Sequence, residues 1–132
     1  MKALTVRQPF ATLLVAGVKR YETRTMMTRH RGLLAIHAGM GKGRIPEGVT
    51  HKDDLVIHRG VAWRAPRGCV LGTVVVVDCV PTDYLHDLDD EQRELGNFAP
   101  GRFAWVVEQP RLFGEPIPAT GKLGMWDWAY TL

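Results

Sequence analysis

The run of residues 69 to 80, CVLGTVVVVDCV, is the feature that most constrains the fold. β-Branched side chains dominate it, and apolar residues occupy both its odd and its even positions. Successive side chains of a strand point to opposite faces of a sheet, so this pattern predicts a strand that is buried on both faces. The chain is therefore expected to build a sheet with protein packed on either side of this strand.

The remaining segments predict a mixed α and β architecture. Strands are expected at residues 3–6, 18–25, 33–38, 103–108 and 111–117 and around 125–128. Pro9 suits a first helical position and Gly17 suits a helix end, which predicts a helix between them. Thr50 and Asp53 resemble the cap of a second helix that runs to Gly60, and the acidic residues 82–95 predict one or two further helical turns. Many short strands with two or three short helices favour an α+β fold built on a small barrel or a strongly curved sheet.

Length and cysteine content predict one intracellular domain. At 132 residues the chain is large enough for one hydrophobic core and too small for two, so residues 1–132 are expected to form a single domain. The first residues lack a signal-peptide pattern, and the apolar run 13–18 is too short to cross a bilayer. Cys69 and Cys79 lie on one predicted strand and are expected to remain free thiols in a reducing compartment. These features predict a cytoplasmic protein without a membrane partner.

Charge is distributed unevenly along the chain. Residues 1–70 contain 13 Lys and Arg against four Asp and Glu, a net charge of +9. Residues 71–132 contain four Lys and Arg against ten Asp and Glu, a net charge of −6. Two interpretations follow: a basic face that meets a polyanion, or two halves that interleave in the fold so that the charges are merely solvated.

Three ionisable residues follow the first predicted helix closely. Lys19, Glu22 and Arg24 come just after Gly17, and such a group is costly to assemble unless the charges pair with one another or with a ligand. In a regular strand Lys19 and Glu22 would point to opposite faces, so they converge only if Lys19 lies in the loop or the strand bulges. We expect the loop. The alternative role for the two residues is an ion pair that ties the helix to the sheet, worth at most about 1 kcal/mol if exposed.

The segment LTVRQPFATLLVAGVKRYETR, followed by RGLLAIHAG, resembles the ASCH domain family. Its hallmark Gly-x-Lys-x-x-Glu-x-Arg string is present as Gly17, Lys19, Glu22 and Arg24. GCVLGTVVVVDCV resembles the family's central strand, and FAWVVEQPRLFGEPIPATGKLGMWDW resembles its C-terminal strand pair and closing Trp segment. The resemblance implies a PUA-like β-barrel and a role in RNA metabolism or as a coactivator module.

The resemblance also implies two possible enzymatic activities. A smaller relative, the bacterial N(4)-acetylcytidine amidohydrolase, uses a lysine as base in the corresponding string, a threonine three residues later as nucleophile and a distant glutamate as proton donor. Lys19 matches that lysine, but Glu22 stands where the threonine would be, and no motif identifies the proton donor. Glu22 could instead take a proton from water, and Arg24 could stabilise an oxyanion or a phosphate. Some family members are reported to cleave single-stranded RNA.

Four further residues are candidate ligand-binding groups. Gln8 is expected in a cleft between the first helix and the barrel, and His37, at a strand end, could stack on a base or could be structural. Arg31 belongs to a basic patch that would suit a nucleic-acid backbone or could simply be solvated. Trp63 lies beside two arginines, as single-strand stacking platforms do, although core packing is the alternative. The glycines of 39–43 are interpreted as a flexible lip of the cleft.

The sequence therefore favours recognition of RNA or a modified nucleoside, with possible hydrolysis through Lys19, Glu22 and Arg24. The alternatives are a non-catalytic RNA-binding module, a ribonuclease and a protein-interaction module. The histidines and cysteines lack the spacing of a metal site, so neither a metal nor another cofactor is expected. The sequence leaves the oligomeric state open.

Overall fold

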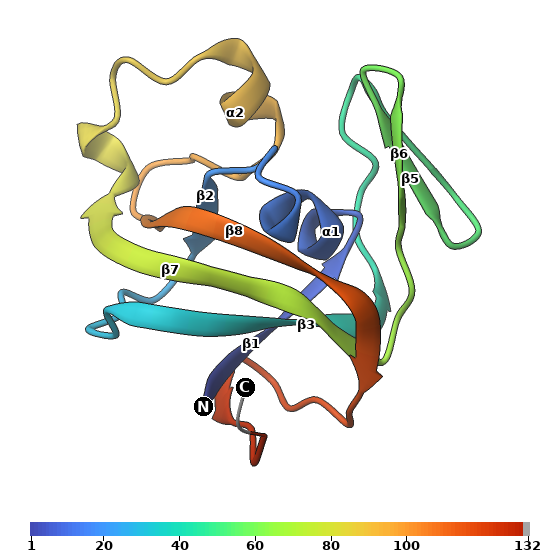
Figure 1. Ribbon diagram of the computed structural model, residues 1–132. Helices are drawn as coiled ribbons and strands as arrows, with labels where there is room; N and C mark the ends of the chain where they lie inside the picture. Colours follow the sequence, from blue (N-terminus) through green and yellow to red (C-terminus); the bar gives the residue numbers. More distant parts are fainter. Residues whose placement is uncertain (131–132) are drawn as a thin grey trace.

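A computed structural model describes residues 1–130 and shows a mixed α+β fold, mostly strands with two short α-helices (Figure 1). The elements follow one another as β1 (Lys2–Gln8), α1 (Phe10–Val15), β2 (Tyr21–Arg24), β3 (Gly32–Lys42), β4 (Val49–Lys52), β5 (Leu55–His58), β6 (Val61–Arg64), β7 (Cys69–Pro81), the 3-10 helix η1 (Thr82–Tyr84), α2 (Asp90–Glu94), β8 (Phe103–Pro118) and β9 (Met125–Asp127). The α+β class expected from the sequence is confirmed.

The run CVLGTVVVVDCV forms β7, which lies inside a six-stranded sheet of order β2-β8-β7-β3-β1-β9. Neighbouring strands are antiparallel except for β1 and β3, which are parallel. Leu71 and Val74 pack on one face in the main core, together with residues of α1, while Val70 packs on the other face with Trp126 and Trp128. The predicted burial on both faces is confirmed for residues 69–76, whereas residues 77–81 are half-buried or exposed.

The sheet curls strongly without closing into a hydrogen-bonded barrel. Strands β2 and β9 are its two edges, and no backbone ladder joins them in the part of the chain that the structure describes. Residues 25–28, which follow β2, and Gly124–Met125, at the start of β9, nevertheless line the same cavity of about 320 Å³. The barrel part of the sequence-based prediction is therefore not confirmed, and a seam with a cavity separates the two edges of the sheet.

The helix expected between Thr50 and Gly60 is wrong, because this region forms the antiparallel sheet β4-β5-β6. Arg59 and Gly60 both have positive φ and connect β5 to β6 through a two-residue turn, the geometry of a type I′ hairpin. Within β5, two more exposed side chains alternate with two buried ones, as in a half-buried strand. β-Branched residues and hairpin turns therefore override the cap-like Thr50 and Asp53.

Several boundaries also differ from the sequence-based prediction. Gly39–Lys42 extend β3 rather than forming a flexible lip. Strand β2 begins at Tyr21, three residues later than expected. The two segments predicted at 103–108 and 111–117 are one strand, β8, with a positive φ at Gln109 between them.

Both cysteines are free thiols, Cys69 buried and Cys79 half-buried. No helix within residues 1–130 is long and apolar enough to cross a membrane. The same residues contain no group of three His, Cys, Asp or Glu arranged to hold a metal ion.

Gly72→Ala is expected to destabilise the fold severely. A methyl group at Gly72 in β7 would overlap the backbone carbonyl of Arg111 in β8, and neither strand can yield without losing its partner. Overpacking of this kind costs about 3 kcal/mol. Urea denaturation should show a loss of that size in the free energy of unfolding.

Gly114→Ala is the matched control, because Gly114 lies in the same strand pair and an added methyl group there meets no atom within 4 Å. Its free energy of unfolding should stay within about 0.5 kcal/mol of the wild type. Equal stabilities for the two variants would contradict the close strand approach at Gly72.

Candidate functional site

The turn that ends α1 places Lys19 in a loop ahead of β2. Gly17 adopts a positive φ of 81°, and the amides of Val18 and Lys19 both donate to the carbonyl of Leu13 at 3.0 Å. These bonds fold the chain back over the helix end. Lys19 thus lies outside the strand that carries Glu22, which is the loop placement that the sequence analysis expected.

The Lys19 ammonium is enclosed by protein. The residue is 2% exposed, and Nζ donates to the carbonyl of Leu95 at 2.6 Å. Glu22 Oε1 lies 3.7 Å from Nζ, and the centre of the Phe10 ring lies at 5.4 Å. Burial lowers the pKa of Lys19 from its usual 10.5, the Glu22 carboxylate opposes that shift, and the cation of Arg44 adds to it. The site therefore holds a desolvated amine beside a carboxylate.

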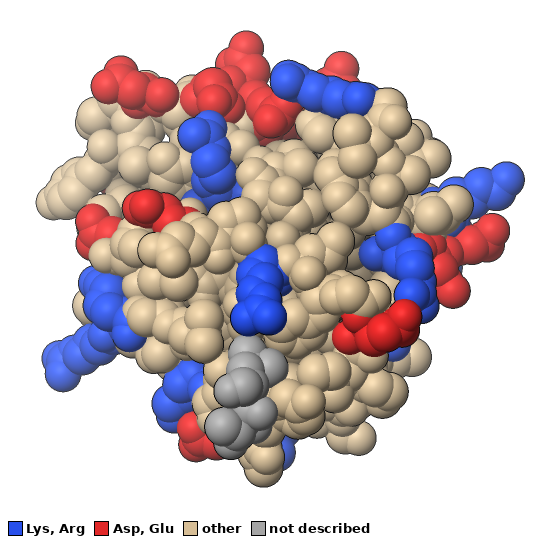
Figure 2. Space-filling view, viewed as in Figure 1, with Lys and Arg blue, Asp and Glu red and all other residues tan. Residues whose placement is uncertain are grey.

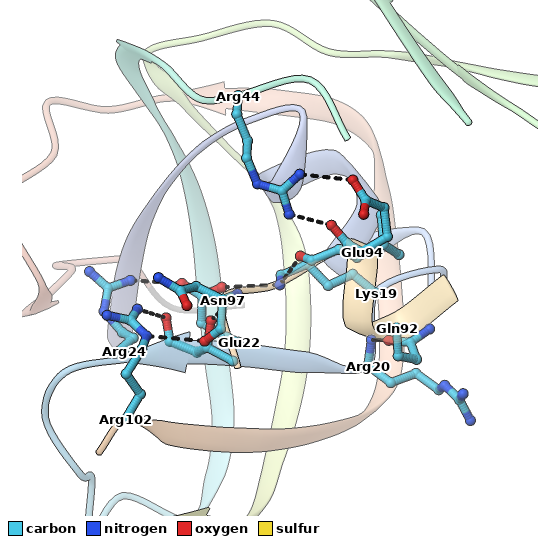
Figure 3. A network of polar contacts seen from close by, with 11 residues as sticks. Lys19, Arg20, Glu22, Arg24, Arg44, Gln92, Glu94, Asn97 and Arg102 are labelled. Atoms are coloured by element: carbon cyan, nitrogen blue, oxygen red, sulfur yellow. Dashed lines mark hydrogen bonds and ion pairs between the residues drawn. The ribbon is translucent and has the colours of Figure 1, made fainter. Parts of the chain in front are cut away.

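Glu22 and Arg24 extend this group from the interior to the surface (Figure 3). They are two residues apart on β2, so both side chains lie on one face, and Arg24 Nη1 donates to Glu22 Oε2 at 2.9 Å. The Arg24 guanidinium lies 5.9 Å from the centre of the Trp105 ring and is 28% exposed. A chain of ammonium, carboxylate and guanidinium thus ends at a cation that solvent reaches.

A cavity opens at the Arg24 end of this chain. It is the cavity of about 320 Å³ at the seam of the curled sheet, and Arg24, Met26, Met27 and Trp105 are among its lining residues. Met26 and Met27 are 74% and 56% exposed, so two flexible apolar side chains flank its mouth.

Helix α2 covers the opposite end of this chain of charges. Arg44 Nη1 donates to Glu94 Oε1 at 3.1 Å, and Nη2 donates to the Glu94 backbone carbonyl. Gln92 Nε2 donates to the carbonyl of Val18 at 2.7 Å, while its Oε1 accepts from the amide of Arg20 at 2.8 Å. Figure 3 shows Arg44 beside Glu94 and Gln92 beside Arg20. Together these contacts hold α2 over the Lys19 loop.

Two of the predicted ligand-binding residues have their polar atoms engaged within the fold. Gln8 is fully buried: Nε2 donates to the carbonyl of Pro66 at 3.0 Å and Oε1 accepts from the amide of Thr12 at 3.1 Å. His37 is 3% exposed, with Nε2 2.8 Å from the carbonyl of Ala119 and Nδ1 3.4 Å from Thr5 Oγ1. Neither residue contacts Lys19, Glu22 or Arg24 through a hydrogen bond.

The other two predicted ligand-binding residues lie on different elements. Arg31, just before β3, donates to the carbonyls of Thr28 and His30 and lies 3.8 Å from Asp78. Trp63 is half-buried on β6 and packs against the core cluster that contains Leu13. The structure thus brings together Lys19, Glu22 and Arg24, and leaves the four predicted ligand-binding residues outside that network.

The sequence analysis does not identify several members of the network. Arg44 and Glu94 are 50 residues apart, and Leu95 contributes only a carbonyl, which leaves no trace in the sequence. The alternation of its strand predicts a core position for Trp105, yet the ring also lies under Arg24. The one available signal is Phe10, an aromatic residue at the start of the helix whose ring lies near Lys19 and Arg44.

The basic and acidic halves of the chain interleave extensively. Six ion pairs join a Lys or Arg of residues 1–70 to an Asp or Glu of residues 71–132: Lys2–Asp127, Arg20–Asp89, Arg31–Asp78, Arg44–Glu94, Arg59–Glu91 and Arg64–Glu115. Figure 2 shows acidic side chains grouped along the edge that carries α2, with Lys and Arg dispersed over the rest of that face. Much of the predicted charge asymmetry is thus neutralised within the fold.

A family model for the ASCH domain matches residues 4–117, a range that contains Gly17, Lys19, Glu22 and Arg24. The chain belongs to the ASCH domain family. Over 128 residues this ASCH domain is 30% identical to mouse activating signal cointegrator 1, and over 127 residues it is 29% identical to the human protein of that name. The chain spans only 21% of the length of each of these relatives, while 93% of the chain is matched.

Solved structures support the fold of this ASCH domain. The crystal structure of an ASCH protein from Zymomonas mobilis superposes with a TM-score of 0.54 at 16% identity, covering 89% of this chain and 72% of that one. A tyrosine-to-phenylalanine variant of that protein gives the same TM-score. At this identity the similarity establishes a shared architecture.

Lys19→Met is expected to destabilise the ASCH domain by about 3 kcal/mol, the cost of removing one partner from a buried charged group. Methionine preserves most of the side-chain volume but leaves the Leu95 carbonyl without its donor and Glu22 with Arg24 alone. Urea denaturation at neutral pH should show this loss. Lys52→Met, at an exposed lysine on β4, should change little.

The difference in the free energy of unfolding between the wild type and Lys19→Met should also depend on pH. Because burial lowers the pKa of Lys19, the unfolded chain binds more protons than the folded chain between that lowered pKa and 10.5. Within this window the free energy of unfolding of the wild type should rise with pH relative to Lys19→Met, and below it the difference should be constant. A difference that falls with rising pH would contradict the buried ammonium.

Proposed function

We propose that this ASCH domain binds single-stranded RNA or a modified nucleoside, with one base held in the cavity at Arg24. The observation that carries the proposal is the planar guanidinium of Arg24, fixed by Glu22, above the Trp105 ring at the mouth of that cavity. Family membership and the domain's mixed α+β fold favour RNA as the class of partner.

The groups at this cavity suit a nucleotide. A base can stack on a guanidinium or an aromatic plane, and the exposed edge of Arg24 can donate two parallel hydrogen bonds to a phosphate. Met26 and Met27 provide apolar walls that adapt to different rings. The ion pair with Glu22 restricts the rotamers of Arg24, so less entropy is lost on binding.

Arg24→Ala is expected to weaken binding of a short single-stranded RNA about tenfold, a free-energy change of roughly 1.4 kcal/mol. Arg24→Lys keeps the charge but loses the planar donor surface, so its affinity should be intermediate. Fluorescence anisotropy at fixed salt measures both, with circular dichroism to verify folding.

Arg111→Ala is the control, because Arg111 is exposed on β8 beside Phe113 and lies outside the lining of the Arg24 cavity. It removes the same charge. If Arg24→Ala and Arg111→Ala lowered the affinity equally, the effect would be one of net charge, and the proposed cavity would be wrong.

Hydrolysis of an N(4)-acylated cytidine is the second candidate, favoured by the Glu22 carboxylate, which lies between Lys19 and Arg24. In this route Glu22 accepts a proton from water, the water oxygen bonds to the acyl carbon, and Arg24 stabilises the oxyanion. The carbon–nitrogen bond then breaks, and Glu22 returns the proton that it took from water to the leaving amine, so that free acetate and cytidine are the products. Enclosure of Lys19 argues against its direct contact with substrate, so the base of this route is Glu22, which is 8% exposed and accepts a hydrogen bond from Arg24 of the cavity lining.

The second candidate predicts deacylation of N(4)-acetylcytidine by the wild type and its loss in Glu22→Gln, both followed by mass spectrometry. Short single-stranded RNAs in the same assay report cleavage. RNA binding without either product would exclude both hydrolytic activities and leave the binding function.

A further inference from the structure

Three of the five methionines of the chain line the Arg24 cavity. Met26 and Met27 follow β2 on one side of the seam in the curled sheet, and Met125 begins β9 on the other side. Their exposed fractions are 74%, 56% and 37%, so solvent reaches all three side chains. The seam therefore gathers thioethers from segments that are far apart in the sequence.

The segment that carries Met26 and Met27 is held through its backbone. The Met26 carbonyl accepts from Trp105 Nε1 at 3.1 Å, and the Thr28 carbonyl accepts from Arg31 Nη1 at 3.1 Å. Neither methionine side chain belongs to a hydrophobic core cluster of the described residues. An oxygen atom can therefore be added to either side chain without entering the core.

The other two methionines have different surroundings. Met40 is 74% exposed, the same fraction as Met26, but it lines a separate cavity of about 710 Å³ formed by the end of β3 and residues 118–123. Met1 is half-buried and packs against the second core cluster. Met40 therefore serves as an internal standard, a thioether of equal exposure outside the Arg24 cavity.

We propose that Met26 and Met27 form an oxidative modification site, and that a peroxide which oxidises them releases RNA from the Arg24 cavity. The release of RNA rests on the proposed function. In the reaction the thioether sulfur bonds to one peroxide oxygen, the oxygen–oxygen bond breaks, and the sulfur is oxidised to a sulfoxide. With hydrogen peroxide as the oxidant, the transferred oxygen gives its proton to the departing hydroxide, which leaves as water.

Sulfoxidation changes both properties that suit this cavity to a nucleotide. The apolar wall made by Met26 and Met27 becomes polar, which weakens its contact with a base. Each sulfoxide oxygen is a hydrogen-bond acceptor in the cavity whose charged lining residue is Arg24, so it competes with an RNA phosphate for the guanidinium donors. Because both side chains are exposed, these changes lower the affinity for RNA while the domain stays folded.

The first test maps oxidation of the full chain by dilute hydrogen peroxide, with and without saturating single-stranded RNA. Trypsin separates Met26 and Met27, in the peptide 25–29, from Met40, in the peptide 32–42, so mass spectrometry follows them independently. In the free protein Met26 and Met40 should oxidise at rates within about threefold of each other. Bound RNA should slow oxidation of the peptide 25–29 at least about fivefold and leave Met40 unchanged.

Oxidation of Met26 and Met27 more than about tenfold slower than that of Met40 would overturn the modification site. Normal oxidation of the free protein without protection by bound RNA would instead refute the RNA-filled Arg24 cavity.

The second test measures RNA affinity by fluorescence anisotropy before and after oxidation, with circular dichroism to verify folding. The oxidised wild type should bind about fivefold more weakly, and methionine sulfoxide reductases should reverse the change. Met26→Leu/Met27→Leu keeps an apolar wall of similar volume, so its affinity should be the same before and after the treatment. Met40→Leu is the matched control and should remain as sensitive to oxidation as the wild type.

Equal losses of affinity on oxidation in the double variant and in the wild type would contradict the assignment to Met26 and Met27. Unchanged affinity of a wild type whose peptide 25–29 is fully oxidised would refute the release of RNA. Because Arg24→Ala tests the cavity without an oxidant, a loss of affinity in that variant beside an oxidation-insensitive wild type would refute the oxidative release alone.

Discussion

The hydrogen bond from Lys19 to the carbonyl of Leu95 is the interaction on which the arrangement of this domain depends. It joins the loop after α1 to the segment after α2, 76 residues away, inside the protein. A buried ammonium is costly, and here the carbonyl, the Glu22 carboxylate and the Phe10 ring compensate for its lost hydration. Removing any one of them leaves the charge or a polar atom without its partner, so the position of α2 and the Lys19 loop is fixed jointly.

The surface charges also pair between segments that are far apart in the sequence. Cations from the first half of the chain meet acids from the second half, as Arg20 does with Asp89 and Arg44 with Glu94. Exposed pairs of this kind contribute little stability each. Their main consequence is that they neutralise much of the positive charge of residues 1–70 and leave fewer cations available for an anionic partner.

The sequence predicted most of what local patterns determine. The doubly apolar run of β7 and the glycine that ends α1 follow from residue type and spacing, and the approach of Lys19 to Glu22 follows once Lys19 is placed in the loop after that glycine. The helix predicted to run from Thr50 to Gly60 failed because a cap-like threonine is a weaker determinant than β-branched residues that can pair in a hairpin. Arg44 and the Leu95 carbonyl could not be predicted, since only the tertiary fold brings them to Lys19.

The open seam of the main sheet has a mechanical consequence. Within residues 1–130 no ladder joins β2 to β9, so the two edges can separate by sliding side chains past one another. A closed barrel would have to break backbone hydrogen bonds, each worth about 1 kcal/mol, to admit a larger guest. We therefore expect purines and pyrimidines to be accommodated with similar ease, and hydrogen exchange in β2 to stay unchanged when either is bound.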